Sequence, residues 1–259
     1  MNVVILCGGL GTRMRDETEF RPKPMVEVAG RPILWHIMKI YAHFGHEDFV
    51  LSLGYKGEFI KQYFMNYEAW TRDVTVRLGA TPGVSFSGRS PETWTVTMTD
   101  TGAQAMTGAR VKRVARHITG DTFMLTYGDG VSDVDLGRLL AFHRQHGRIA
   151  TVTGVRPPSR FGELVTDGHR VVEFSEKPSI SQGGYINGGF FVFNRAVFDY
   201  LSDDDGCVLE REPLERLAKD HQLEMYRHDG YWQCMDTPRD LQHLHEAWQH
   251  GAPWKVWAE

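Results

Sequence analysis

Apolar positions in the first part of the chain follow two alternating patterns. The runs at residues 3–6 and 48–53 are short, continuous and largely apolar, which indicates buried strands. Residues 31–45 and 58–67 instead place apolar side chains at helical spacing, so both segments predict helices. Strands that alternate with helices across short loops predict a parallel sheet covered on both faces. Ligands of such sheets bind beyond the carboxyl ends of the strands.

A second pattern interrupts this alternation. Residues 74–78 and 94–99 alternate apolar and polar side chains around a segment rich in Gly, Ser and Pro, which predicts an inserted hairpin or loop. Beyond it we expect strands at 123–127, 149–155, 171–174, 190–193 and 223–226, and helices at 109–118, 135–147, 195–201, 212–220 and 238–251. The chain is therefore predicted to be α/β: one Rossmann-like, three-layer α/β/α domain with a mostly parallel central sheet and β-rich insertions.

Length and charge narrow the function classes. A chain of 259 residues can bury the core of one large domain. Its 29 basic and 33 acidic residues give a net charge of −4 without a long basic run, so nothing favours nucleic acid as a partner. No apolar run approaches the ~18 residues of a membrane span, the chain starts directly in a strand, and the three cysteines fit a reduced compartment. We therefore expect a cytoplasmic protein without a membrane partner.

The stretch from Leu6 to Pro24 predicts a phosphate-binding loop. Glycines follow the first strand directly, and because they lack Cβ atoms their N–H groups can point into one concavity and meet phosphate oxygens. Arg13 adds a fixed positive charge, and two prolines hold Lys23 in an extended segment. The candidate nucleotide-binding residues of this loop are Leu6, Gly8, Gly9, Gly11, Thr12, Arg13 and Lys23.

Two better-known phosphate loops do not fit these residues. The third glycine of the dinucleotide pattern Gly-x-Gly-x-x-Gly falls on Met14, and the Gly-Lys-Ser/Thr ending of the ATPase loop is absent from the sequence. A nicotinamide cofactor and a P-loop are therefore disfavoured. The plainer interpretation is a glycine-rich turn with a surface Arg and a surface Lys, and the Pro-Lys-Pro segment argues against it.

Two aspartates are candidate ligands for Mg²⁺. Asp129 lies between glycines at the end of a predicted strand, and Asp236 precedes the last predicted helix. Mg²⁺ takes one or two carboxylates together with phosphate oxygens and water, so these two could share one ion. Their alternative roles are a turn residue and a helix cap. Arg110 is a further candidate, because a cation at a helix start opposes the helix dipole and suggests an anionic or polar ligand.

Residues 176–189 carry two motifs that suit a sugar phosphate. Glu176-Lys177-Pro178 holds a lysine against a proline, and Asn187-Gly188-Gly189 offers amide and backbone groups of the kind that bind sugar hydroxyls. On spacing alone, a surface ion pair between Glu176 and Lys177 and a β-bulge at the two glycines fit about as well.

Together these motifs resemble those of the sugar-phosphate nucleotidylyltransferases. The resemblance rests on residues 8–13, 22–24, 129, 176–178 and 187–189. Further matches, such as residues 126–130 and 235–237, extend it over nearly the whole chain and toward the members that use CTP and glucose 1-phosphate. It implies the nucleotide-diphospho-sugar transferase fold, with a nucleotide-binding half at about 1–130 and a sugar-phosphate-binding half at about 131–259, and a homo-oligomer. Cys7 replaces an alanine and Leu209 a tryptophan, and the second change bears on a sugar pocket or an oligomer contact.

The resemblance also implies the reaction. In it, glucose 1-phosphate attacks the α-phosphorus of CTP with the help of Mg²⁺, which gives CDP-glucose and pyrophosphate. Four residues would be catalytic: Arg13 on pyrophosphate, Lys23 on the α-phosphate, and Asp129 and Asp236 on Mg²⁺. Beside the opening loop, Thr107, Arg110 and Gly128 would contact the nucleotide, and Glu176, Lys177, Asn187 and Gly188 the sugar phosphate.

Three alternatives stay open at this point. The same chemistry could use UTP or dTTP, since base choice depends on the shape of the pocket. A metal-dependent glycosyltransferase is suggested by Asp133-Val-Asp135 and Asp203-Asp-Asp205, which mimic an Asp-x-Asp metal pair but leave the opening loop unexplained. A sugar-nucleotide sensor without catalysis is the third. A Trp-rich end with Trp248, Trp254 and Trp257 suits an oligomer contact.

Overall fold

A seven-stranded sheet forms the centre of the protein in a computed structural model that describes residues 1–156, 163–167, 170–175 and 184–258. From edge to edge the strands are β14 (Leu223–His228), β10 (Ala150–Val155), β13 (Ile186–Asn194), β8 (Thr122–Tyr127), β1 (Asn2–Leu6), β4 (Asp48–Leu53) and β7 (Thr95–Asp100). Every adjacent pair is parallel except those that involve β13, which runs antiparallel to β8 and β10. The predicted mostly parallel sheet is therefore confirmed.

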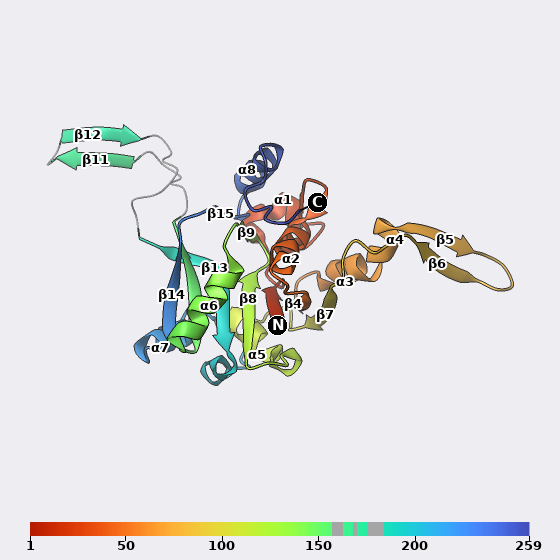
Figure 1. The fold of residues 1–259 in the computed structure, drawn as a ribbon, viewed down its shortest axis with the longest axis horizontal. Helices are drawn as coiled ribbons and strands as arrows, with labels where there is room; N and C mark the ends of the chain where they lie inside the picture. Colours follow the sequence, from red (N-terminus) through yellow and green to blue (C-terminus); the bar gives the residue numbers. More distant parts are fainter. Residues whose placement is uncertain (157–162, 168–169, 176–183, 259) are drawn as a thin grey trace.

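Helices cover both faces of this sheet (Figure 1). Strand β1 is buried throughout, and its side chains alternate: Val3 and Ile5 join one apolar cluster, Val4 and Leu6 the other. On the first face lie α2 (Ile33–His43), α3 (Gly57–Met65) and α6 (Leu136–His146), and on the second α5 (Thr107–Arg113) and α7 (Glu212–Lys219). Helix α8 (Pro238–Gln249) joins the first cluster through Leu244 but lies beyond the end of the sheet (Figure 1). A parallel strand at the centre of a sheet needs apolar side chains on both faces. The three-layer arrangement follows from this requirement.

Shorter elements join these layers. The helical ones are α1 (Arg15–Thr18), α4 (Tyr67–Thr71) and the 3₁₀ turns η1 (Thr12–Met14), η2 (Lys23–Met25), η3 (Ala115–His117) and η4 (Arg195–Tyr200). Strand β2 (Glu27–Val28) pairs with β3 (Arg31–Pro32), and β9 (Gly130–Ser132) with β15 (Trp232–Cys234). None of the helices in the described ranges has both the length and the apolar character that a bilayer crossing requires.

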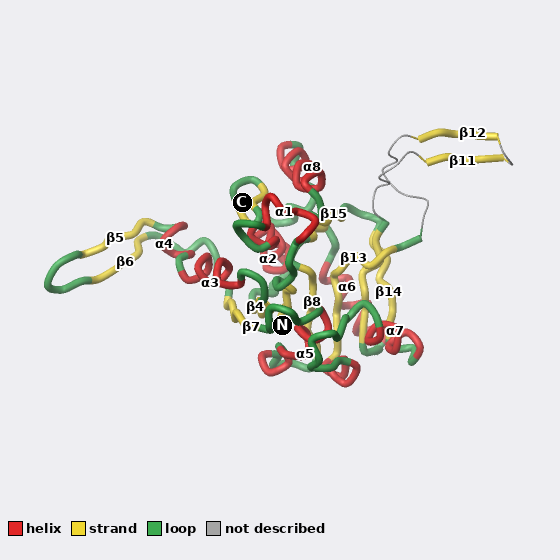
Figure 2. The backbone as a smooth tube through the Cα atoms, turned by 180° about the vertical axis from the view of Figure 1, so that it is seen from behind, coloured by secondary structure: helices red, strands yellow, loops and turns green. Residues whose placement is uncertain are grey.

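Two hairpins leave the central body on opposite sides (Figure 2). One pairs β5 (Asp73–Arg77) with β6 (Gly83–Ser87), and the other pairs β11 (Glu163–Asp167) with β12 (Arg170–Ser175). The expected β-rich insertions are thus present. Residues 94–99, however, do not belong to the first insertion, because β7 is the edge strand of the main sheet and runs parallel to β4. A half-buried edge strand shows the same alternation as a hairpin strand, so the pattern could not distinguish them.

Two predicted helices have different limits. The segment at 109–118 is an α-helix only over Thr107–Arg113 and ends in a 3₁₀ turn, while the segment at 58–67 divides at Asn66 into α3 and α4.

The Trp-rich end of the chain is not a free surface. Trp254 is fully buried, and its ring lies 6.1 Å from that of His36 on α2. These tryptophans therefore pack against the core of their own chain.

Candidate active site

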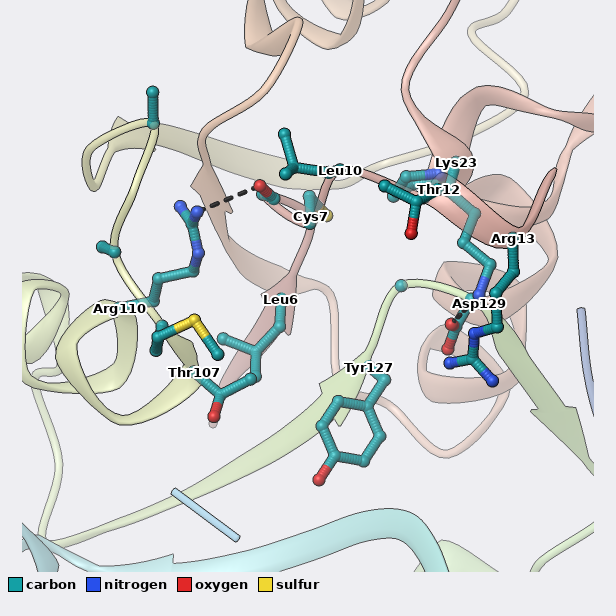
Figure 3. Close-up of a pocket in the computed structure, with 18 of the residues that line it drawn as sticks. Leu6, Cys7, Leu10, Thr12, Arg13, Lys23, Thr107, Arg110, Tyr127 and Asp129 are labelled. Atoms are coloured by element: carbon teal, nitrogen blue, oxygen red, sulfur yellow. Dashed lines mark hydrogen bonds and ion pairs between the residues drawn. The ribbon is translucent and has the colours of Figure 1, made fainter. Parts of the chain in front are cut away.

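A cavity of about 430 Å³ lies at the carboxyl ends of β1 and β8 (Figure 3). Its wall consists of residues 6–13, Lys23 and Pro24, segment 103–107, residues 127–129 and the side chains of Arg110 and Asp236. Lys23, Arg13 and Asp129 lie on one side of it, and Arg110 and Thr107 on the other. Sheets of this kind bind ligands at this edge, and most of the residues predicted for the nucleotide meet here.

The glycine loop leaves its backbone available to a ligand. Gly11 has a φ of +65°, in the left-handed region that glycine adopts most easily, and turns the chain into η1. In the described part of the chain, no acceptor meets the N–H groups of Gly9, Leu10 or Gly11. A Cβ at Gly9 would have no neighbour within 4 Å, so one side of the loop is open. Free N–H groups in an open concavity suit phosphate oxygens.

Four charged side chains form a chain of ion pairs beside this loop. Nζ of Lys23 lies 2.6 Å from Oδ2 of Asp129 and 2.6 Å from Oδ1 of Asp236, and Nη1 of Arg13 lies 2.9 Å from Oδ2 of Asp236. Two positive and two negative charges compensate one another. The sequence had placed these four residues in one site, and the structure brings them together.

Lys23 remains charged in this setting. Burial alone would lower its pKa, but the carboxylates of Asp129 and Asp236 outweigh that effect and raise the pKa above the ordinary value. The position of its ammonium group, held between two carboxylates, shows that a cation is favourable there. Asp236 is itself held by the start of α8, because its N–H donates to Oδ2 of Asp240 at 3.1 Å, and Asp240 forms a capping box with the N-cap residue Thr237.

The donor set fits Mg²⁺. Among the described residues of the cavity wall, Asp129 and Asp236 are the two carboxylates, so they would be the protein ligands. Two carboxylates, with phosphate oxygens and water filling the other positions, are what Mg²⁺ usually takes at nucleotide sites. Both side chains are partly exposed, at 26% and 19%, and line the cavity.

Arg110 is bound by the protein itself. Its guanidinium is buried, donates from Nη1 to the carbonyl of Leu53 at 2.9 Å and to Oγ1 of Thr101 at 2.8 Å, and donates from Nη2 to the carbonyl of Gly8 at 3.0 Å. Arg110 also lies in the last turn of α5 and not at the helix start that the sequence suggested, so the argument from the helix dipole is wrong, while a contact with the nucleotide stays a prediction. A Cβ at Gly8 would collide with this guanidinium, so Gly8 is needed for packing.

A hydrogen-bond network on the other side of the cavity centres on Glu210. Its Oε2 accepts from the hydroxyl of Thr107 at 2.5 Å and its Oε1 from the hydroxyl of Tyr127 at 2.5 Å. Tyr127 in turn accepts from Nδ2 of Asn187 at 3.0 Å. Burial and the adjacent Glu210 raise the pKa of Tyr127, so the phenol stays protonated. The network joins Thr107, which was predicted to contact the nucleotide, to Asn187, which was predicted to contact the sugar phosphate.

Strand β13 presents Asn187 to this network. Its pairing with β10 is irregular between Phe191 and Asn187, so the β-bulge considered above is present and carries the Asn-Gly-Gly motif. Gly189 has a φ of +86°, and a Cβ there would contact the ring of Tyr127. Indole Nε1 of Trp232 donates to the carbonyl of Gly188 at 2.7 Å. Glu176 and Lys177 lie outside the described residues.

The sequence did not single out Tyr127 or Glu210 as site residues. Tyr127 stands two positions before Asp129. Because side chains two positions apart along a strand point to the same side, this spacing was the available signal for Tyr127. No local signal existed for Glu210, whose neighbours come from distant segments.

The two residues that depart from the family pattern, Leu209 and Cys7, lie in the core. The side chain of Leu209 is fully buried, and only its N–H reaches Oγ1 of Thr107. Cys7 is buried too, which raises the pKa of its thiol.

The Asp-x-Asp pairs have structural partners instead of facing the cavity. Asp135 caps α6 by accepting from the N–H of Arg138 at 2.8 Å, and Asp133 pairs with Nε2 of His228 at 2.9 Å. Asp205 pairs with Nη2 of Arg113 at 2.8 Å. The described part of the cavity wall includes none of them. This placement disfavours the glycosyltransferase alternative.

Comparison with known proteins agrees with this site. A family model described as "Nucleotidyl transferase" matches residues 2–250. The chain belongs to this family of nucleotidyltransferases, as the motifs predicted. It is 49% identical over 259 residues to a glucose-1-phosphate cytidylyltransferase of Salmonella typhi, covering 99% of this chain and 100% of that one. It is 46% identical over 258 residues to a probable glucose-1-phosphate cytidylyltransferase of Bacillus subtilis, with 99% and 100% coverage.

Solved structures show the same fold at low sequence identity. HddC from Yersinia pseudotuberculosis superposes with a TM-score of 0.69 at 23% identity, covering 95% of this chain and 99% of that one. An inositol-1-phosphate CTP transferase from T. maritima superposes with a TM-score of 0.65 at 15% identity, covering 96% of both chains. The predicted nucleotide-diphospho-sugar transferase fold is thereby confirmed.

Proposed function

We propose that this chain transfers a cytidylyl group from CTP to α-D-glucose 1-phosphate. A phosphate oxygen of the sugar phosphate forms a bond to the α-phosphorus, the bond from the α-phosphorus to the bridging oxygen breaks, and pyrophosphate leaves with that electron pair. The observation that carries the proposal is the convergence of Arg13, Lys23, Asp129 and Asp236 beside a glycine loop with free N–H groups. The relatives at 46–49% identity support CTP and glucose 1-phosphate as the substrates.

The residues of the chain position two anions and neutralise their charge. The N–H groups of Gly9 and Gly11 bind phosphate oxygens, Arg13 holds the pyrophosphate portion, and Lys23 the α-phosphate. The triphosphate competes with the two aspartates for these cations. Arg13 is 70% exposed and can exchange its partner without disturbing the core. Mg²⁺ held by Asp129 and Asp236 would supply further positive charge to the phosphate oxygens.

The second substrate faces the network around Glu210. Asn187 and Gly188 lie beside Tyr127, and Thr107 joins the same carboxylate from the nucleotide side. We assign Asn187 and Gly188 to the sugar, with Glu176 and Lys177 as its further predicted partners. A nucleotide half at about 1–130 and a sugar-phosphate half at about 131–259, and a cytoplasmic location, belong to the same proposal.

Pyrophosphate release tests this function. Purified protein is incubated with Mg²⁺, glucose 1-phosphate and each of CTP, UTP, dTTP, GTP and ATP in turn, and pyrophosphate and the sugar nucleotide are both quantified. We expect CTP to give the highest kcat/KM and CDP-glucose as product. Faster turnover with UTP or dTTP would overturn the base assignment. CTP binding without any pyrophosphate release would instead support the sensor alternative, and sugar transfer without pyrophosphate a glycosyltransferase.

A further inference from the structure

The carboxylate of Glu210 lies behind the wall of the active-site cavity. The described residues of this wall include Thr107 and Tyr127 but not Glu210. The hydroxyl groups of Thr107 and Tyr127 point toward the same side of the cavity (Figure 3). Each of them donates to a different oxygen of Glu210 at 2.5 Å. Glu210 is therefore placed to act on ligands through these two hydroxyl groups.

The backbone before Glu210 is fastened to the start of α5. The carbonyl of Cys207 accepts from the N–H of Gly108 at 2.9 Å. The N–H of Leu209 donates to Oγ1 of Thr107 at 2.9 Å. A Cβ at Gly108 would lie 2.5 Å from Sγ and 2.9 Å from the carbonyl oxygen of Cys207, so only glycine permits this close approach. The nucleotide side of the network is thus held by backbone contacts as well as by the carboxylate.

The amide of Asn187 is fixed on the sugar side of the network. Its Nδ2 donates to the hydroxyl of Tyr127 at 3.0 Å, and its Oδ1 accepts from the N–H of Gly189 at 2.9 Å. These two bonds determine which way the amide points. An amide nitrogen carries two hydrogens, and among the described residues no acceptor takes the second one. This second N–H is available to a ligand.

Glu210 determines where the protons of both hydroxyl groups go, because a carboxylate only accepts hydrogen bonds. The single proton of Thr107 is used on Glu210, and the N–H of Leu209 occupies one of its two lone pairs. What remains for the nucleotide is an acceptor. The proton of Tyr127 is also used on Glu210, so its oxygen accepts from Asn187. The remaining N–H of Asn187 is a donor for the sugar phosphate.

We propose that Glu210 is a positioning residue for both substrates. It orients the nucleotide through Thr107, and it orients the sugar phosphate through Tyr127 and Asn187. This role rests on the proposed function, which brings the two ligands to these residues. Thr107 lies across the cavity from the cations assigned to the phosphates, so the donor that it meets is an amino or hydroxyl group of the nucleoside (Figure 3). Because the attacking oxygen must be aligned with the α-phosphorus, one group that orients both ligands favours the reaction.

Initial rates of pyrophosphate release over a grid of CTP and glucose 1-phosphate concentrations test this role. We expect Glu210→Ala to raise the KM of both substrates roughly tenfold or more, since each substrate loses the support of a hydrogen bond to a charged group. The matched control is Glu212→Ala, which removes a carboxylate that is 78% exposed and pairs with Arg216 at 3.6 Å. It should keep both KM values. A Glu210→Ala variant with a lower kcat and both KM values unchanged would show a merely structural residue and overturn the proposal.

Glu210→Gln separates hydrogen-bond direction from side-chain size. It keeps the shape of the side chain and replaces one acceptor oxygen by an NH₂ group, so one of the two hydroxyl groups loses its acceptor. We expect the KM of at least one substrate to rise, by less in total than in Glu210→Ala. Wild-type KM values for both substrates in Glu210→Gln would contradict the proposed direction of the bonds.

Double-mutant cycles identify the path of the effect. Thr107→Val removes the hydroxyl and should raise the KM for CTP, whereas Thr107→Ser keeps the hydroxyl and should stay close to the wild type. Combined with Glu210→Ala, Thr107→Val should add little, because the hydroxyl that it removes has already lost its acceptor. Tyr127→Phe should behave in the same way for the KM of glucose 1-phosphate. Full additivity in either cycle would overturn the proposal.

Calorimetric titration separates this role from the proposed function. The dissociation constant of CTP is measured without the sugar phosphate, and Glu210→Ala should raise it roughly tenfold. A wild type that binds CTP but releases no pyrophosphate would refute the proposed function alone. Equal binding of CTP by the wild type and Glu210→Ala would overturn the role of Glu210. Circular dichroism checks the fold of Glu210→Ala, and if this variant is unfolded, Glu210→Gln carries the same comparisons.

Discussion

Lys23 and Asp236 stand 213 positions apart in the sequence, yet Nζ of the lysine lies 2.6 Å from Oδ1 of the aspartate. Asp129 contacts the same ammonium from a third segment. One largely buried positive charge therefore fixes two carboxylates, one from the turn after β8 and the other from the turn before α8. This arrangement keeps the carboxylates close together, where they would otherwise repel each other.

Replacement of either carboxylate should stop the reaction while the fold persists. We expect Asp129→Ala and Asp236→Ala each to lower pyrophosphate release on the order of 100-fold or more, since a single carboxylate holds Mg²⁺ poorly. Lys23 keeps one partner in each variant, so circular dichroism should be unchanged. Asp203→Ala removes an exposed acidic side chain away from the cavity and serves as the control. Full activity of either cavity variant would contradict the two-carboxylate site.

Arg13 should matter for catalysis and little for stability. Its side chain is largely exposed and pairs with Asp236 at 2.9 Å. If it stabilises charge that develops on pyrophosphate, Arg13→Ala should cost on the order of 3 kcal/mol in the transition state, or about 100-fold in kcat. Arg15→Ala, an exposed arginine two positions away, is the matched control. Equal kinetics of the two variants would remove Arg13 from the mechanism.

Tyr127 should act on the sugar phosphate more than on the nucleotide. Its hydroxyl accepts from the amide of Asn187 at 3.0 Å and donates to Oε1 of Glu210, and Tyr127→Phe removes both hydrogen bonds. The loss of the bond that orients Asn187 should raise the KM for glucose 1-phosphate roughly tenfold, whereas Glu210 keeps its bond from Thr107, so the KM for CTP should change much less. Tyr200→Phe breaks a similar bond to Asp220, far from the cavity, and should change neither constant. A rise in the KM for CTP alone would assign Tyr127 to the nucleotide.

His36 should make stability depend on pH. Burial is the main cause that lowers its pKa to about 4, while its hydrogen bond with the carbonyl of Val28 opposes this effect. In the unfolded chain the pKa is about 6.5, so as pH falls from 6.5 toward 4 only the unfolded state takes up this proton. The folded state then loses up to about 1.4 kcal/mol per pH unit from this group.

Urea unfolding between pH 4.5 and 7.5 measures this dependence. His36→Gln should flatten the slope of unfolding free energy against pH relative to the wild type. His245→Gln, which changes an exposed histidine, should keep the wild-type slope. An identical slope for the wild type and His36→Gln would show that His36 does not carry the dependence.

The predictable part of the structure was the part encoded locally. Short apolar runs and helical spacing identified β1, β4 and α2, and the rule that ligands bind at the carboxyl ends of parallel strands brought Lys23 and Asp129 to one edge. Asp236 was a candidate because it precedes the last helix, and the resemblance assigned it to Mg²⁺. Each of these inferences needed only neighbouring residues or one general rule of sheet topology.

The unpredicted part depends on contacts between distant segments. Arg110 was interpreted as a cation that needs a ligand, because the local sequence does not reveal that it donates hydrogen bonds to the carbonyls of Leu53 and Gly8. Glu210 had no motif of its own, and its partners Thr107 and Tyr127 lie 103 and 83 positions away. Such groups acquire their roles only when the chain has folded.

The guanidinium of Arg110 also limits how this protein can change. It fills the space beside Gly8 and Gly54, where an added Cβ at either position would overlap it, and it carries hydrogen bonds to both flanking loops. A methyl group at position 8 becomes acceptable only after the arginine has been shortened, and one at position 54 would in addition lie 2.8 Å from the carbonyl oxygen of Gly8. A shortened side chain, in turn, leaves backbone carbonyls without donors. These three positions are therefore coupled, and redesign of the nucleotide pocket has to treat them as one unit.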